Sequence, residues 1–417
     1  MARLSFDELP QEIIDAVAAL LDLQSLRNLR LTSRSIAAKV TNARGFQAYF
    51  LSKEIRLFDI GQLREFGPQT EPQRCGRLVR HLTLVSNGKV QIPAKRKLAR
   101  VGVENLGCAS PISITLTMQH EEPPSVKDWL RIWRAAAETF HNTALALSTA
   151  GVPVQAFDLF GQTRWCSLAC DQLTQTLAVV DLPASFKHLK KLSLCLSQHA
   201  LKRHGKREES RVAGQMNTRA LCEFLALFPE LEDLELRWYK LHARKCTDAL
   251  QEESRYFERI VELCRFPRLR QCALRGVFTT ADTLLSFLRR LRINSLTMVD
   301  VTVRPGFFRP IFDHVVNHMD TLEYLHLDQL SEKKLLHFEG PGEPHFRSIG
   351  RRVGPMDLTR VGSAIHDPIS YHFATGRQLG SYEFMEFLRQ NYNNYGPPDH
   401  WHSRSIRHWH RYLGGNP

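Results

Sequence analysis

The sequence of 417 residues lacks several features that would assign it to a common functional class. It has no run of about 18 uncharged apolar residues, so we expect no membrane-spanning helix. Its first 26 residues carry five acidic side chains, and no signal peptide is expected there. The motifs GxxxxGK[ST], GxGxxG, GxSxG and HExxH, which mark nucleotide-binding proteins, hydrolases and metalloproteases, are absent. We therefore assign no catalytic residue and expect neither enzymatic activity nor a cofactor.

Cysteine and histidine do not form the usual patterns of disulfide frameworks or metal sites. The nine cysteines are odd in number, include no CxxC pair and mostly lie in apolar stretches. We expect free thiols in a reducing compartment, the cytoplasm or the nucleus. The one dense histidine cluster, which has arginines beside it and no cysteine nearby, is His400, His402, His408 and His410. Structural zinc usually takes four ligands, often with cysteine, so we expect a basic solvated tail and no metal.

The charge balance is basic but moderate. Fifty-six Lys and Arg against 43 Asp and Glu give a net charge of +13 over the whole chain. The basic stretches at residues 95–97 and 202–207 are short, and the remaining charge is mixed with acidic residues. Nucleic-acid surfaces gather basic charge on one face, so nucleic acid is not the expected partner.

The first 45 residues predict three short helices. Apolar residues recur at three- and four-residue steps in segments that follow Pro10, Asp22 and Ser33. Asp and Ser are favoured residues immediately before a helix. So small a unit cannot bury all of these apolar side chains by itself. A cap on a larger fold and a docking module for a partner both explain the pattern.

Residues 9–36 (LPQEIIDAVAALLDLQSLRNLRLTSRSI) resemble the F-box motif. The match includes the Leu-Pro opening, the acidic Glu12 and the paired isoleucines, whereas Ile36 stands where an aromatic residue is common. F-boxes bind the Skp-family adaptor of cullin–RING ubiquitin ligases. The resemblance implies these adaptor-binding residues: Leu9, Pro10, Ile13, Ile14, Val17, Leu20, Leu23, Leu26 and Leu29.

The body of the chain repeats a strand-like pattern, apolar-x-x-apolar-x-apolar. The pattern occurs seven times, beginning at Val79, Val154, Leu189, Leu231, Leu269, Ile293 and Leu322. Helical patterns lie between these strands, and the alternation predicts parallel strands joined by helices. The region resembles the irregular leucine-rich repeats that follow many F-boxes, as in fungal F-box proteins, although the consensus Asn is missing. A doubly wound α/β domain is the alternative.

We therefore predict an α/β protein with three parts: a three-helix F-box at 1–45, an irregular leucine-rich-repeat-like solenoid at 46–335 and an irregular C-terminal region at 336–417. Residues 86–125 are expected to form a loop, a short strand and a break, and residues 200–215 a charged insertion. One strand is expected near residues 370–373 and one short helix at 382–388. The last residues are expected to form a poorly ordered tail.

The predicted function is that of a substrate-recognition subunit of an SCF-type cullin–RING ubiquitin ligase. A leucine-rich scaffold without a ligase role and a basic nucleic-acid-associated protein are the alternatives. We expect Leu192, Leu234, Leu296 and Leu325 in the core and Ser193, Glu235, Ala273, Thr297 and His326 on the outer face. The candidate residues for binding a protein target are Glu235, Arg237, Trp238 and Tyr239. Alternatively, Trp238 and Tyr239 pack beneath the next loop.

Overall fold

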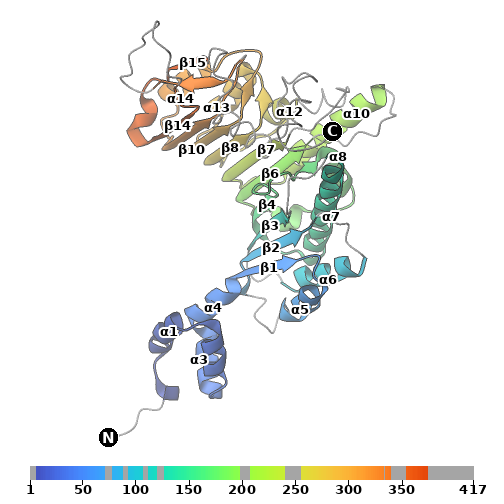
Figure 1. Ribbon diagram of the computed structural model, residues 1–417, viewed down its shortest axis with the longest axis vertical. Helices are drawn as coiled ribbons and strands as arrows, with labels where there is room; N and C mark the ends of the chain where they lie inside the picture. Colours follow the sequence, from blue (N-terminus) through green and yellow to red (C-terminus); the bar gives the residue numbers. More distant parts are fainter. Residues whose placement is uncertain are drawn as a thin grey trace.

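The computed structural model describes residues 6–70, 78–87, 93–106, 111–119, 126–197, 207–239, 255–332, 334–339 and 354–373. These residues form an α/β fold with one large, mostly parallel sheet. The molecule is elongated, and a small group of helices lies at one end of it (Figure 1). Among the described residues, no helix combines the length and apolarity needed to cross a membrane.

The main sheet and its neighbours contain short strands. The strands are β1 (Ser52–Arg56), β2 (His81–Ser86), β3 (Ile112–Met118), β4 (Val154–Leu159), β5 (Leu168–Ala169), β6 (Lys191–Ser197), β7 (Asp233–Tyr239), β8 (Gln271–Arg275), β9 (Phe278–Thr279), β10 (Ser295–Val299), β11 (Thr302–Val303), β12 (Tyr324–Asp328), β13 (Leu336–Phe338), β14 (Asp357–Val361) and β15 (Tyr371–Phe373).

Helices precede the sheet and alternate with its strands. They are η1 (Phe6–Glu8), α1 (Gln11–Leu20), α2 (Leu23–Arg30), α3 (Arg34–Asn42), α4 (Arg44–Leu51), α5 (Ile60–Thr70), α6 (Pro93–Glu104), α7 (Val126–Ala150), α8 (Cys170–Leu177), α9 (Pro183–Phe186), α10 (Arg207–Ala226), α12 (Tyr256–Leu263), α13 (Ala281–Arg289), α14 (Arg309–His318) and η3 (Gly362–His366).

The strands of the main sheet follow one another in chain order. The order is β1-β2-β3-β4-β6-β7-β8-β10-β12-β14, and β5 pairs with β6. All neighbours are parallel except β14, which runs antiparallel to β12 at the edge. A doubly wound sheet reverses its strand order partway, whereas this order does not reverse.

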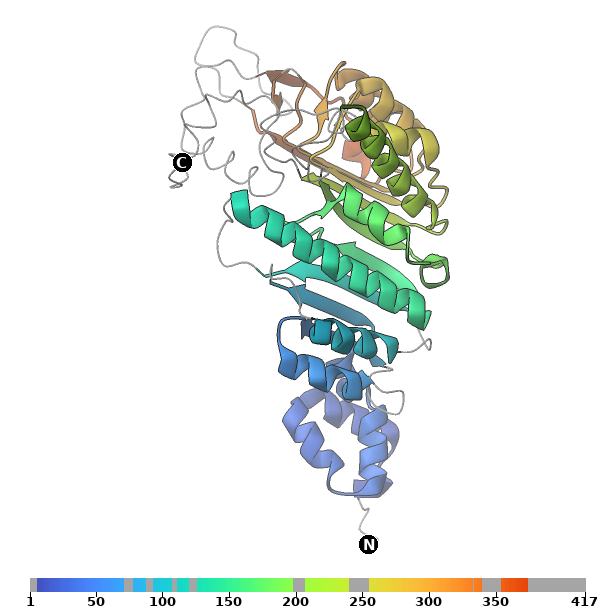
Figure 2. The ribbon, with the colours of Figure 1, turned by 90° about the vertical axis from the view of Figure 1, so that its right-hand side faces the viewer.

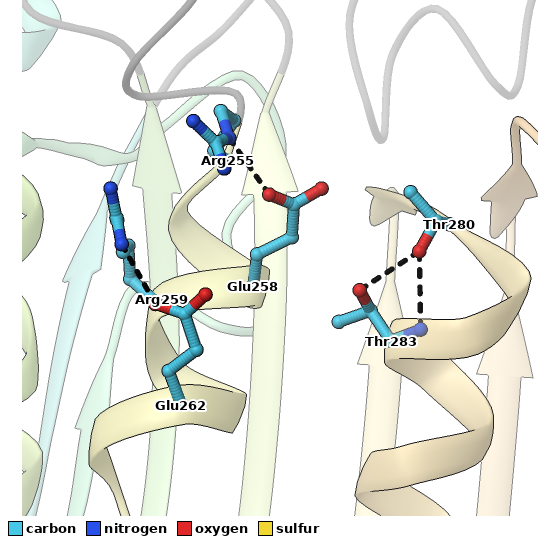
Figure 3. A network of polar contacts seen from close by, with 6 residues as sticks. All are labelled: Arg255, Glu258, Arg259, Glu262, Thr280 and Thr283. Carbon is cyan, nitrogen blue, oxygen red and sulfur yellow. Dashed lines mark hydrogen bonds and ion pairs between the residues drawn. The ribbon is translucent and has the colours of Figure 1, made fainter.

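The helices that join the strands form a layer on one face of the sheet (Figure 2). In that layer α5, α6, α7, α8, α10, α12, α13 and α14 each contact the next. Local polar contacts hold individual helices, as Figure 3 shows for α12 and α13. Arg259 Nη1 pairs with Glu262 Oε2 at 2.7 Å, and Thr280 Oγ1 accepts the Thr283 N–H at 3.1 Å and so caps α13.

Strand alternation directs apolar residues toward the helix layer. One inward row runs through Leu82, Ile114, Phe157, Leu192, Leu234, Cys272, Leu296 and Leu325. The four leucines predicted for the core are all 0% exposed and belong to one continuous hydrophobic cluster. That prediction is confirmed, because a period of two places every second residue on the same face.

Four strands of the main sheet, β1, β3, β5 and β14, lie outside the repeat pattern, although the short strand expected within residues 86–125 is present as β3. The first, β1, has Lys53 in register with Leu82, where the pattern requires an apolar residue. The second, β3, is preceded by Pro111 at the first apolar position, and its Ile114 is in register with Leu82. The loop expected before β3 contains the helix α6. The unusually long interval from Val79 to Val154 therefore holds one additional strand.

The N-terminal helices have a hydrophobic core of their own. Its buried members are Ile14, Ala18, Leu26, Ile36, Val40, Ala43 and Phe46. Phe50 packs against this cluster, and Phe46 is 0% exposed within it. Because α4 supplies both aromatic residues, the helical unit extends to Leu51 and not only to residue 45.

The main core also continues past the predicted boundary at residue 335. Leu336, Phe338 and Ile365 are buried in it, and β14 extends the sheet. The strand expected near residues 370–373 is present as β15, paired with β13. The charged insertion expected at residues 200–215 differs from the prediction, because α10 begins at Arg207, within that segment. The predicted helix at 382–388, the tail and the histidine cluster lie outside the described residues.

Candidate interaction surfaces

Polar side chains fix the chain reversals of the N-terminal helices. Asp22 Oδ1 accepts the Ser25 N–H at 2.7 Å, and Ser33 Oγ accepts the Ile36 N–H at 3.1 Å. These bonds satisfy backbone donors that have no partner inside a helix. Lys39 Nζ donates to the carbonyl oxygen atoms of Asp7 and Leu9 at 2.6 and 2.7 Å. The segment before α1 is thereby tied to α3.

The nine predicted adaptor-binding residues divide between the core and the surface of this unit. Ile14 and Leu26 are buried. The partly buried members are Leu9, Val17, Leu23 and Leu29, and the exposed members are Pro10, Ile13 and Leu20. Ile13 is 47% and Leu20 86% exposed. Ile13, Val17 and Leu20 stand at helical spacing along α1, and we call them the α1 stripe.

Outside the predicted contacts, Leu31 is the most exposed of the large apolar residues of this unit. Leu31 follows α2 and is 85% exposed. Its exposure could have been suspected from the sequence, because Thr32 and Ser33 directly after it begin the next helix and leave no apolar neighbour to cover it.

The sheet face opposite the helix layer carries a row of polar and small residues. Hydrogen-bonded register places in one line across the sheet Glu54, Thr83, Thr115, Asp158, Ser193, Glu235, Ala273, Thr297, His326 and Thr359. We call this line the open-face row. It contains all five residues that the alternation of the strands predicted to face outward.

Two carboxylates occupy the centre of the open-face row. Ser193 lies between Asp158 and Glu235 in register, and its Oγ donates to Glu235 Oε2 at 3.3 Å. The Gly161 N–H donates to Asp158 Oδ1 at 2.7 Å. Burial, together with the charge of Glu235, raises the pKa of Asp158 to about 6, although the hydrogen bond from Gly161 acts in the opposite direction.

Arginines stand beside these carboxylates. Arg275 Nε pairs with Glu235 Oε1 at 2.7 Å, and both side chains remain partly exposed. Arg237 is 7% exposed and its Nη1 donates to the Gly161 carbonyl oxygen at 2.7 Å. Arg237 therefore holds the loop after β4 against the sheet, and Glu235 and Arg275 are the groups that reach solvent.

The aromatic residues predicted to bind a target lie in the core. Trp238 is 4% and Tyr239 1% exposed. Trp238 stacks on Tyr256 with ring centroids 4.3 Å apart, and Tyr239 meets the edge of Trp133 at 6.4 Å. The alternative prediction, that both rings pack beneath the next loop, describes neither fully: Trp238 packs on α12, which follows β7, whereas Tyr239 packs on α7, which precedes it. Alternation along β7 already places Trp238 on the inward side with Leu234 and Leu236.

A second acidic group lies toward the β14 edge. Burial, together with the charges of Asp357 and Asp300, raises the pKa of Asp328 to about 6. Asp328 and Asp357 are register partners on β12 and β14. His326, on the same strand, shares a hydrogen bond of 2.9 Å with Thr359 Oγ1. Negative charge is thus present at the centre and at one end of the open face.

Within the described ranges, no group of three or more His, Cys, Asp or Glu is arranged to hold a metal ion. A search of the curated proteins finds no relative of this chain, and no protein-family model matches it.

Proposed function

We propose that this chain is a substrate-recognition subunit of an SCF-type cullin–RING ubiquitin ligase. The observation that carries the proposal is the α1 stripe, which lies on the segment that resembles an F-box. Ile13 and Leu20 stay exposed although the unit has its own core. A partner that covers these side chains gains their burial energy. A Skp-family adaptor is the partner that the resemblance implies.

The sheet is the proposed target-binding part, a leucine-rich-repeat-like solenoid. Strands in chain order with helices on one face support this, because each strand–helix unit buries its apolar row only against its neighbours. The open-face row then offers Glu235 and Asp158, together with Arg275, to a protein target. The chain needs no catalytic group, since holding a target lysine near the charged E2 raises its effective concentration.

Adaptor binding tests the first half of this proposal. Exposed apolar side chains contribute about 1.5–3 kcal/mol each when fully buried. Replacing Ile13 and Leu20 by Asp should therefore weaken affinity for a purified Skp-family adaptor by about tenfold or more in calorimetry. Val179→Asp is the matched control, because Val179 is apolar and 68% exposed but follows α8. Unchanged affinity in the double variant would sink the F-box assignment.

Target capture tests the second half. Glu235→Lys removes the carboxylate that pairs with Arg275 and places two cations together. Thr359→Lys adds the same charge at the edge of the open-face row and serves as the control. Proximity labelling with proteasome inhibition should lose the target with Glu235→Lys and keep it with Thr359→Lys, while both variants retain the adaptor. Equal target recovery from both variants would place recognition elsewhere.

A leucine-rich scaffold without a ligase role is the second candidate. It is favoured by the direct continuation of α4 into β1, which joins the helical unit to the first strand of the sheet. In that case the substitutions on the α1 stripe should not change the binding of any partner. A nucleic-acid partner is disfavoured at the open face, because Asp158 and Glu235 would repel phosphate.

A further inference from the structure

Two cysteines from neighbouring helices meet in the helix layer. Cys222 lies in α10, and Cys264 follows the last residue of α12. The two helices are in contact. The Cys264 thiol donates to the Cys222 carbonyl oxygen at 3.8 Å, which brings the two residues into contact. The Cys264 N–H also donates to the Ile260 carbonyl oxygen at 2.8 Å, which fixes its position against α12.

Guanidinium groups surround the end of α12 where Cys264 stands. Arg265 Nη1 donates to the carbonyl oxygen atoms of Cys264 and Glu262 at 2.9 and 3.1 Å. Arg290 Nη2 donates to the carbonyl oxygen of Val261. The last carbonyl groups of a helix lack partners within it and attract cations, which explains why two arginines gather here. The same charges favour a thiolate at Cys264.

The pKa values agree with this geometry. The hydrogen bond from Cys222 lowers the pKa of Cys264, and the charges of Arg265 and Arg290 lower it further. The same hydrogen bond raises the pKa of Cys222. Of the two sulfur atoms, Cys264 is therefore the one that ionises first and can act as a nucleophile.

The other described cysteines provide a contrast. Cys195 Sγ donates to the Cys166 carbonyl oxygen at 3.2 Å, but both residues are 0% exposed. Burial raises the pKa of Cys195 and that of Cys272 to about 12 each. Cys222 and Cys264 are 5% and 6% exposed, so they lie nearer the surface than Cys166 and Cys195.

We propose that Cys222 and Cys264 form a site of reversible oxidation by peroxide. The Cys264 thiolate attacks hydrogen peroxide; an S–O bond forms, the O–O bond breaks and hydroxide leaves, taking up a proton to become water. The Cys222 thiol then attacks the resulting sulfenic acid; the S–S bond forms, the S–O bond breaks and a second water leaves with the thiol proton. Two thiols and one peroxide thus give one disulfide and two waters.

The disulfide would tether two helices that precede strands of the proposed target-binding face. Residue Cys222 lies in the helix before β7, which carries Glu235, and Cys264 ends the helix before β8, which carries Arg275. Oxidation thus restricts movement between the two repeats that supply this ion pair. The proposal concerns the thiols alone and does not depend on ligase function.

The test uses the full-length chain treated with increasing hydrogen peroxide. After remaining thiols are blocked in denaturant, peptide mapping should find one peptide that links Cys222 to Cys264 and that disappears on reduction with dithiothreitol. Cys272→Ser is the control and should form the same link, because Cys272 is buried on β8. Cys222→Ser should leave the Cys264 sulfenic acid unresolved, so that dimedone labels Cys264 in this variant and several-fold less in the wild type.

Two results would overturn the proposal. The first is the absence of a Cys222–Cys264 peptide at peroxide concentrations that already oxidise exposed methionine, such as Met216, which is 57% exposed. The second is equal dimedone labelling of Cys264 in the wild type and in Cys222→Ser, since that would mean Cys222 does not resolve the sulfenic acid. The thermal transition of Cys222→Ser should be measured to show that this variant is folded, because both results can be interpreted only for a folded chain.

Discussion

The helical unit at residues 6–51 and the sheet that follows it treat apolar side chains in opposite ways. The helical unit has a small core and leaves Ile13, Leu20 and Leu31 exposed. The sheet buries its inward rows completely and presents polar residues on its open face. A small unit cannot enclose its apolar residues, whereas stacked repeats can. In the proposed function, the adaptor binds the apolar surface and the protein target binds the polar one.

Replacing leucine by aspartate should therefore affect stability strongly in the sheet and very little in the helical unit, and this is the largest difference we expect. Leu234 is 0% exposed, and even Leu234→Ala should lower the free energy of unfolding by about 2–5 kcal/mol through lost burial and a cavity. Leu234→Asp should prevent folding, because it buries an unpaired charge.

Leu20→Asp completes that comparison. Leu20 is 86% exposed, so the free energy of unfolding should change by no more than about 0.5 kcal/mol. Denaturant titration of both variants measures the difference. A comparable loss of stability with Leu20→Asp would mean that the α1 stripe is part of a core and not a free surface.

The strands with a regular apolar pattern could be predicted from sequence, whereas β1 could not. Leu192, Leu234, Leu296 and Leu325 follow a period of two without interruption, and they occupy one core as expected. The sheet position of β1 was hidden by Lys53, whose long side chain can reach Gln69 Oε1 at 2.7 Å and so occupy an inward position. A sequence pattern that scores only apolar residues misses such a strand.

The candidate target-binding residues could be predicted only in part, for a similar reason. Alternation along the strand gave Glu235 its outward position. The same rule places Trp238 inward, where it is buried, but it does not account for Arg237 and Tyr239, which are buried on the other side of β7. Their contacts with Gly161 and Trp133 bury them, and these partners lie 76 and 106 residues away along the chain. Tertiary contacts of that kind leave no periodic signal.

The charge of Asp158 on the open face should also lower the stability of the folded chain, by less than the substitutions of Leu234 do. Asp158 has a pKa of about 6 in the folded chain against an ordinary value of 3.8. The folded state therefore binds the proton more tightly, and stability falls as the pH rises from about 4 through 6. The pKa difference of about 2 units, at about 1.36 kcal/mol per unit, corresponds to a loss of stability of at most about 3 kcal/mol above pH 6.

Asp158→Asn tests this pH dependence, because Asn keeps an oxygen to accept the Gly161 N–H but carries no charge. The variant should be more stable than the wild type above pH 6 and equal to it near pH 4, as measured by urea titration at both pH values. Asp328→Asn should act in the same direction, since the pKa of Asp328 is likewise raised to about 6. A variant that is less stable than the wild type at pH 7.5 would contradict the assignment.

The smallest effects should come from the ion pairs between neighbouring strands, and these pairs differ in how exposed their side chains are. Lys190 Nζ pairs with Glu232 Oε1 at 2.9 Å, with side chains 57% and 36% exposed. Glu235 and Arg275 pair at 2.7 Å with side chains 15% and 32% exposed. Exposed pairs contribute about 0–1 kcal/mol and are screened by salt. Double-mutant cycles to Ala should give a coupling energy of about 0.5 kcal/mol or less for Lys190–Glu232, lost in 1 M NaCl, and a larger, less salt-dependent value for Glu235–Arg275. Equal coupling energies would show that the Glu235–Arg275 pair is as fully hydrated as the Lys190–Glu232 pair. The centre of the open face would then have no special electrostatic property that favours target binding.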